Sequence, residues 1–158
     1  MSDINIGLGV EQRKGAAALL KGLLADEYIL YTKTRKYHWN VEGPSFSELH
    51  KFFEAQYDSI DESIDEIAER IRQLGEYSPG SFAEFQASAR LKEDSGANVS
   101  SKKMIANLLA DHEALIRFLR ADLETIKDKF GDAGDQDFFT GLMQDHEKAA
   151  WMLRSYLA

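Results

Sequence analysis

The sequence contains no cysteine, and this absence excludes several classes of protein at once. Disulfide-stabilised secreted domains, iron–sulfur proteins, thiolate zinc sites and enzymes with a cysteine nucleophile all need that residue. The chain also has no apolar run near the roughly 20 residues of a membrane-spanning helix, and no basic, apolar leader at its start. We therefore expect a cytoplasmic protein with no membrane segment.

Proline is equally scarce, and strand-like patterns are missing. Pro44 and Pro79 are the only prolines, and each lies in a glycine-containing break. No segment alternates polar and apolar residues over a useful length, whereas apolar residues recur at helical spacing. The sequence predicts an all-α protein with long helices over residues 10–37, 45–74, 100–130 and from the 131–134 turn to Leu157, and a short helix over 81–89.

Four long helices with a short helix in the long middle connection predict a ferritin-like four-helix bundle with a crossover. We expect one domain over residues 1–158, with residues 1–9 as a short N-terminal extension. For the second helix, a Ser45/Glu48 capping box predicts the start and Gly75 predicts the end.

The net charge of -8 argues against a surface for duplex DNA, because nonspecific DNA affinity comes from lysine and arginine. An acidic protein attracts cations instead.

Five potential metal ligands lie within the first half of the chain: His38, His50, Glu54, Asp65 and Glu69. At roughly 100° per residue, the last four share one flank of the second helix, beside its apolar stripe. His50 and Asp65 are nevertheless about 22 Å apart along that helix, too far to bind one ion. Two copies packed antiparallel near Ser59 and Ile60 would bring opposite ends together, so the sequence predicts a site between subunits.

The donor types indicate which metal this site would bind. Imidazole together with carboxylate suits iron, zinc or manganese, whereas calcium and magnesium prefer oxygen alone. A solvated acidic helix face is the alternative reading of the carboxylates. His112 and His146 have no ligand partner at helical spacing, so we interpret them as surface or interface histidines. For Trp39 and Trp151 we expect core or interface packing; beside a redox metal, Trp39 could also donate an electron.

Several segments resemble the Dps family, the DNA-binding proteins from starved cells, also called mini-ferritins. The matching segments are residues 37–43, Leu49-His50, residues 64–70 and Leu74-Gly75. The resemblance extends over nearly the whole chain. It implies a homododecamer, hollow inside, that oxidises Fe(II) with hydrogen peroxide or oxygen, stores ferric mineral and protects against oxidative damage.

The resemblance also implies residue roles. His38, His50 and Glu54 of one subunit would bind iron together with Asp65 and Glu69 of its two-fold mate, and zinc or manganese could substitute. Glu54 departs from the family, which most often has aspartate there.

The resemblance further implies acidic iron-entry pores, for which Asp132, Asp135 and Asp137 are the candidates. Their alternative role is a solvated turn with a helix cap.

Three other functions compete with iron storage. A nucleoid DNA-binding protein of the same family, with secondary iron chemistry, is the main alternative, although residues 1–9 carry no lysine or arginine and we do not expect DNA binding. A di-iron bundle of the bacterioferritin kind would need Glu-x-x-His on two helices, and the chain contains none. A purely structural helical assembly would show no metal-dependent activity.

Overall fold

The computed structural model describes residues 4–158 and is all-helical over them, as the sequence predicts. Residues 1–3 of the predicted N-terminal extension lie outside the described part. The helical elements are α1 (Val10–Asn40), α2 (Phe46–Gln73), α3 (Phe82–Ser88), α4 (Ser101–Thr125), the π-helical segment η1 (Ile126–Phe130) and α5 (Ala133–Ser155).

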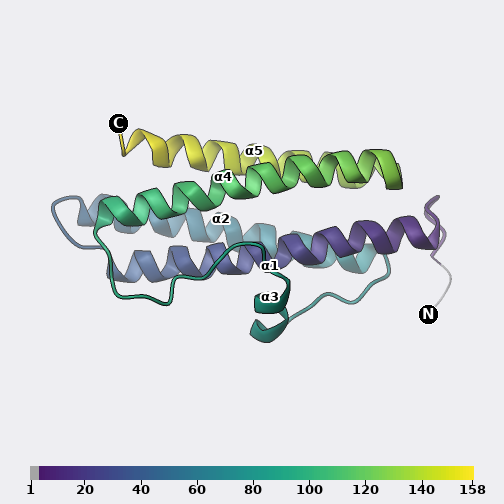
Figure 1. Cartoon of the computed structure of the whole chain (residues 1–158), viewed down its shortest axis with the longest axis horizontal. Helices are drawn as coiled ribbons and strands as arrows, with labels where there is room; N and C mark the ends of the chain where they lie inside the picture. Colours follow the sequence, from purple (N-terminus) through teal and green to yellow (C-terminus); the bar gives the residue numbers. More distant parts are fainter. Residues whose placement is uncertain (1–3) are drawn as a thin grey trace.

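Two long hairpins make the bundle (Figure 1). Helix α1 packs along α2, and α4 packs along α5. The long connection between the hairpins carries α3, which packs against α1 on the outside of the bundle. This arrangement is the ferritin-like four-helix bundle expected from the sequence.

The core lies along the axis of the bundle, where the apolar stripes of the long helices meet. Helix α2 has one buried apolar stripe, whose fully or nearly fully buried members are Leu49, Phe53, Ile60, Ile64, Ile67 and Ile71. Side chains three and four residues apart share one face of a helix, so this stripe leaves the carboxylate flank of α2 outside the core.

The helix ends differ from the predictions in specific ways. The Ser45/Glu48 capping box is wrong, because the Ser45 side chain makes no cap hydrogen bond and Glu48 instead accepts one from the Tyr156 hydroxyl at 2.9 Å. Gly75 does stop α2, with a left-handed φ of 92° that a side chain would strain. Helix α1 continues to Asn40, three residues beyond its predicted end.

The middle connection is fastened to α1 by a buried carboxylate. Asp26 is 0 % exposed and accepts hydrogen bonds from the backbone N–H groups of Arg90 and Leu91 at 2.6 and 2.9 Å. The Arg90 side chain also bonds Asp26 at 2.7 Å and reaches Asp122 of α4 at 2.9 Å. These contacts tie the connection to both hairpins and therefore fix the position of α3.

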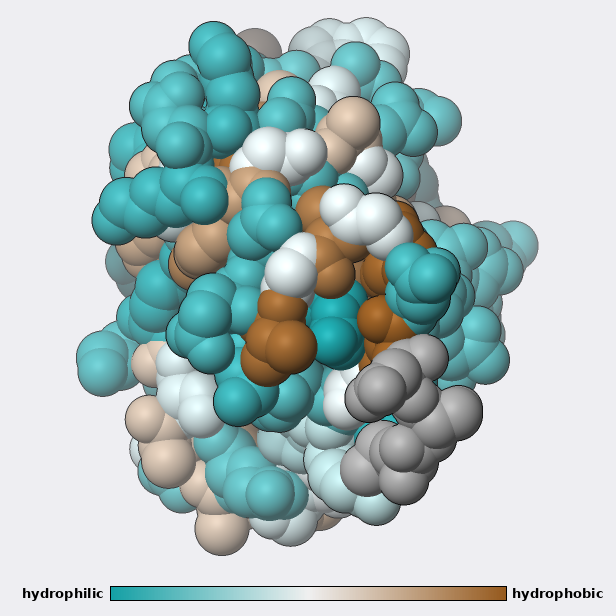
Figure 2. All heavy atoms as spheres, turned by 90° about the vertical axis from the view of Figure 1, so that its right-hand side faces the viewer, coloured by the Kyte–Doolittle hydropathy of each residue, from teal (hydrophilic) through white to brown (hydrophobic). Residues whose placement is uncertain are grey.

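At the end of the bundle where α2 stops and α5 begins, the surface is mostly hydrophilic, with a few apolar side chains near its centre (Figure 2). Within residues 4–158, no helix combines the length and apolarity needed to cross a membrane.

Candidate metal centre

His38 and His50 face each other at one end of the α1/α2 hairpin. His38 lies in the last turn of α1 and His50 in the first turns of α2, so the short turn between these helices brings the two rings together. The rings stack with centroids 3.7 Å apart and an interplanar angle of 23°. The structure therefore brings these two of the five predicted ligands together within one chain.

The two imidazoles hold each other in place through the backbone. Nδ1 of His38 lies 2.7 Å from the carbonyl oxygen of His50, and Nδ1 of His50 lies 2.9 Å from the carbonyl oxygen of His38. Because a carbonyl only accepts, both Nδ1 atoms must carry the proton, and each neutral ring then has a lone pair on Nε2. This is the arrangement that orients a metal-binding histidine.

Aromatic neighbours restrict the orientation of both rings further. Tyr57 packs edge-on against His38 with centroids 5.2 Å apart, and Phe46 lies 5.2 Å from His50. His38 is only 6 % exposed. The pair is therefore a rigid element with two nitrogen lone pairs rather than two mobile surface side chains.

The three carboxylates of the predicted site are exposed on α2 and have no hydrogen bond or ion pair with any described residue. They are Glu54, Asp65 and Glu69. Among residues 4–158 of one chain, no three histidine, aspartate or glutamate side chains are arranged so that together they could hold a metal ion. One chain thus brings His38 and His50 together and leaves Asp65 and Glu69 further along α2, as the rise of about 1.5 Å per residue requires.

The three pore candidates have different surroundings. Asp132 caps α5 by accepting from the backbone N–H groups of Gly134 and Asp135 at 2.9 and 3.2 Å. Asp135 is 0 % exposed and forms an ion pair with Arg70 at 2.6 Å. Asp137 is exposed. The capping role weighed for this turn is confirmed at Asp132, and Asp137 is the candidate whose carboxylate remains open to solvent.

The interpretation of His112 and His146 as surface or interface histidines is wrong. They are 2 % and 5 % exposed, and their Nδ1 atoms lie 2.9 Å apart inside the bundle. His146 Nε2 also contacts Glu27, a buried carboxylate that the sequence reasoning missed, at 2.7 Å. Each of these three residues falls on the apolar stripe of its helix, and this position predicts that it is buried.

The two tryptophans are not core residues of this chain. Trp39 is 65 % and Trp151 62 % exposed. The Arg35 guanidinium lies over the Trp39 ring at 5.2 Å and over the Tyr57 ring at 5.0 Å. The alternative expectation, packing at an interface between subunits, stays a prediction for both.

With this geometry established, comparison with known proteins identifies the family. A family model described as a ferritin-like domain matches residues 17–158. The chain is 31% identical to a DNA protection during starvation protein of Helicobacter pylori, over 89% of this chain and 96% of the relative. The chain belongs to the Dps family of ferritin-like proteins.

Two further comparisons extend the match over essentially the whole chain. A low temperature-induced protein of Nostoc sp. is 52% identical over 157 residues, which are 99% of this chain and 88% of that protein. The crystal structure of a Dps protein from Vibrio cholerae O1, described as a member of a broad superfamily of ferritin-like diiron-carboxylate proteins, superposes with a TM-score of 0.92. It is 33% identical and covers 100% of this chain and 98% of its own.

Proposed function

We propose that this Dps-family protein stores iron and protects against oxidative damage by oxidising Fe(II) with hydrogen peroxide or oxygen at sites shared between subunits. Membership of the family supports iron storage and protection in general. The finer proposal, a ferroxidase with shared sites in a hollow homododecamer, depends on the residues described above.

The observation that carries the proposal is the reciprocal bonding of His38 and His50. It leaves an Nε2 lone pair on each of two stacked, rigidly held rings, which suits a borderline metal such as iron that binds imidazole ligands. The exposed carboxylate of Glu54 lies one turn beyond His50 on α2 and can complete this half of the site.

The other half would come from a second copy of the chain. His50 and Glu69, and likewise Glu54 and Asp65, are symmetric about the point between Ser59 and Ile60. Antiparallel packing of two α2 helices about that point therefore places Asp65 and Glu69 of each copy beside the histidines of the other, with two equivalent sites per pair. Ser59 is exposed, so this part of α2 is open to a partner.

Iron is the substrate in this scheme. The imidazoles and carboxylates bind two Fe(II) ions, which give two electrons to one molecule of hydrogen peroxide. The peroxide takes up two protons, its O–O bond breaks and two water molecules form. The two Fe(III) ions then leave for the interior of the assembly, where hydrolysis deposits the mineral and releases protons.

Peroxide addition to anaerobically Fe(II)-loaded protein tests the proposal, with the ferric absorbance as the readout. Glu69→Gln removes a charge at nearly constant size and should reduce the initial rate strongly while leaving the assembly intact. Glu66→Gln is the matched control, since it removes an exposed carboxylate one turn away that lies outside the proposed ligand set. Equal rates in Glu69→Gln and the parent would show that Glu69 is not a ligand.

A further inference from the structure

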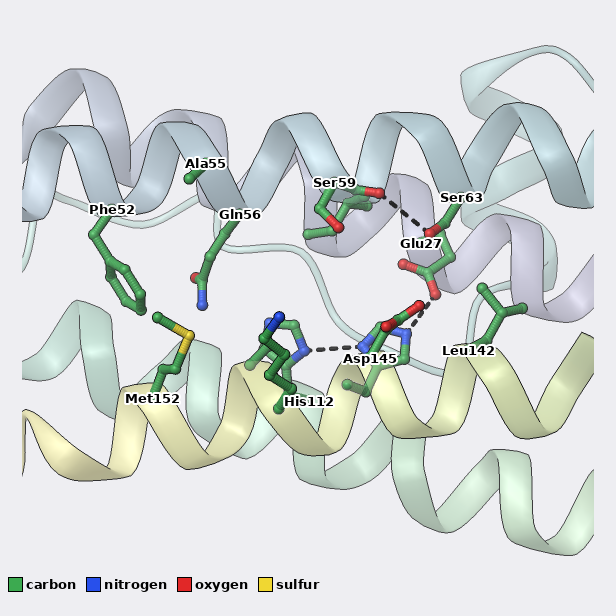
Figure 3. A pocket seen from close by; sticks show the side chains of 14 residues that line it. Glu27, Phe52, Ala55, Gln56, Ser59, Ser63, His112, Leu142, Asp145 and Met152 are labelled. Atoms are coloured by element: carbon green, nitrogen blue, oxygen red, sulfur yellow. Dashed lines mark hydrogen bonds and ion pairs between the residues drawn. The ribbon is translucent and has the colours of Figure 1, made fainter.

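Three buried ionisable side chains from three different helices form a line through the interior of the bundle (Figure 3). Glu27 of α1, His146 of α5 and His112 of α4 are 0 %, 5 % and 2 % exposed. His146 contacts Glu27 through Nε2 at 2.7 Å and His112 through Nδ1 at 2.9 Å. This line is separate from the His38/His50 pair, which lies at the end of the α1/α2 hairpin.

The chemistry of the contacts fixes where the protons lie. A carboxylate only accepts, so His146 donates its Nε2 proton to Glu27 and, when neutral, has a lone pair on Nδ1. His112 then donates its own Nδ1 proton to His146, which leaves the lone pair of His112 on Nε2. That nitrogen is buried and has no hydrogen-bond partner among the described residues.

A cavity of about 300 Å³ lies between α2 and α5 beside this nitrogen. Gln56 of α2, 9 % exposed, extends into the same cavity, and both polar atoms of its amide are also unpartnered (Figure 3). The cavity lining also includes the exposed residues Ser59, Asp145 and Lys148, so solvent reaches it between the two helices. The cavity is large enough for a water molecule, and the unpartnered atoms of Gln56 and His112 supply the polar partners that such a water needs.

We propose that Glu27, His146 and His112 form a proton-binding site that is loaded from this cavity, at one proton per chain. The incoming proton bonds to Nε2 of His112 while the Nδ1 proton of His112 moves to Nδ1 of His146. His112 stays neutral and changes tautomer, and His146 becomes an imidazolium between the Glu27 carboxylate and His112. The net charge of the three residues changes from minus one to zero.

The surrounding charges favour one proton and oppose a second. Burial lowers the pKa of His146, but the charge and the hydrogen bond of Glu27, together with the charge of Asp145, outweigh burial and raise that pKa above its ordinary value. Burial lowers the pKa of His112 well below its ordinary value, and the charge on His146 lowers it further. The pair therefore accepts a first proton on His146 and resists a second on His112.

The other charged groups nearby are either paired or lie at the mouth of the cavity. Helix α2 contributes only uncharged side chains to the lining, and Lys148 of α5 lies at the opening. The acidic neighbours of His112 on α4 are each bound by a cation: Asp111 by Lys33 of α1 at 2.6 Å, and Glu113 by Arg154 of α5 at 2.7 Å.

Solid-state NMR of the ¹⁵N-histidine-labelled assembly tests the proposal, because ring nitrogen shifts distinguish imidazolium from the two neutral tautomers. The chain has four histidines, so a His38→Asn/His50→Asn variant leaves only the signals of His112 and His146. Near pH 6.5, the ordinary histidine pKa, we expect one imidazolium and one neutral ring protonated at Nε2. At higher pH the imidazolium should disappear while the second ring changes to the Nδ1-protonated tautomer.

Glu27→Gln keeps an acceptor for His146 and removes the charge, so the midpoint of this transition should fall by about 1–3 pH units. Asp145→Asn is the matched control; it removes a charge that makes no hydrogen bond to the pair and should shift the midpoint less. Three results in the His38→Asn/His50→Asn variant would each overturn the proposal. They are two neutral rings at pH 6.5, two imidazolium rings at that pH, and a His112 tautomer that does not change with pH.

Discussion

Replacing His38 by asparagine separates the two roles that the structure gives this side chain. The amide nitrogen of asparagine takes the place of imidazole Nδ1 and can still donate to the His50 carbonyl, but asparagine has no atom in the place of Nε2. His38→Ala loses both the donor to the His50 carbonyl and the Nε2 atom that would bind the metal. The two variants should therefore differ in stability and agree in losing iron affinity.

The expected magnitudes follow from the contacts of the ring. His38→Ala leaves the His50 carbonyl without its donor, which costs about 1–3 kcal/mol, and removes ring stacking worth about 0.5–1.5 kcal/mol. We expect His38→Ala to lower the free energy of unfolding by about 1.5–4.5 kcal/mol, the sum of these two effects. His38→Asn should lower it by about 0.5–1.5 kcal/mol, because this variant loses chiefly the stacking. Both should weaken Fe(II) binding by at least the roughly 10- to 100-fold typical of losing an outer-sphere contact.

Urea unfolding of the metal-free protein measures the first difference, at one fixed protein concentration because assembly links stability to concentration. Anaerobic Fe(II) titration measures the second. If His38→Asn bound Fe(II) as tightly as the parent, Nε2 of His38 would not be a ligand and the proposed site would be refuted.

Three further predictions concern the connection, the start of α5 and DNA. Asp26→Ala should lower the free energy of unfolding by about 3–5 kcal/mol. The substitution breaks the buried ion pair with Arg90 and removes the carboxylate that accepts hydrogen bonds from two backbone N–H groups. Asp26→Asn should cost less, since one amide oxygen can still accept both backbone bonds; equal losses in thermal unfolding would contradict this. Burial raises the pKa of Asp135 to about 6, against the opposing Arg70. The folded protein thus binds this proton more tightly than the unfolded chain, and the resulting stability should be lost as pH rises from about 4 to about 6. Urea unfolding across that range should show a shallower pH dependence for Asp135→Asn than for the parent, and identical slopes would refute the assignment. Finally, the net charge of -8 predicts no magnesium-independent gel shift of duplex DNA at physiological salt, and a submicromolar shift would show otherwise.

The fold was predictable from the sequence because apolar residues repeat along each helix with a regular spacing. Apolar residues three and four apart indicate the four long helices, and the glycine and proline breaks separate them. The helix ends were less predictable, since they depend on distant contacts. Glu48, for example, bonds Tyr156, which is 108 residues away, instead of capping α2.

The meeting of His38 and His50 was predictable for a related reason. Spacing along α2 predicts that His50, Glu54, Asp65 and Glu69 share one flank. His38 was recognisable as a potential ligand from the same sequence pattern, because it lies just before the short turn that leads to His50. The sequence did not predict the contacts among Glu27, His112 and His146, because spacing within one helix says nothing about partners on other helices. His112 and His146 are 34 residues apart in sequence, and Glu27 and His146 are 119 residues apart. Reading each of them as part of its apolar stripe would have placed all three inside the bundle.

Complementation tests directly whether each metal site takes ligands from two copies of the chain. A His38→Asn/His50→Asn variant and an Asp65→Asn/Glu69→Gln variant should each be inactive alone. After dissociation and random reassembly in equal amounts, about half of the two-fold interfaces are mixed, and each mixed interface holds one whole site and one site that lacks all four ligands.

With ligands shared between two copies, we expect mixed assemblies to recover about a quarter of the parent rate of peroxide-dependent Fe(II) oxidation. Native mass spectrometry establishes that the two variants share assemblies. No recovery in mixed assemblies would place all the ligands within one chain and contradict a site shared between subunits.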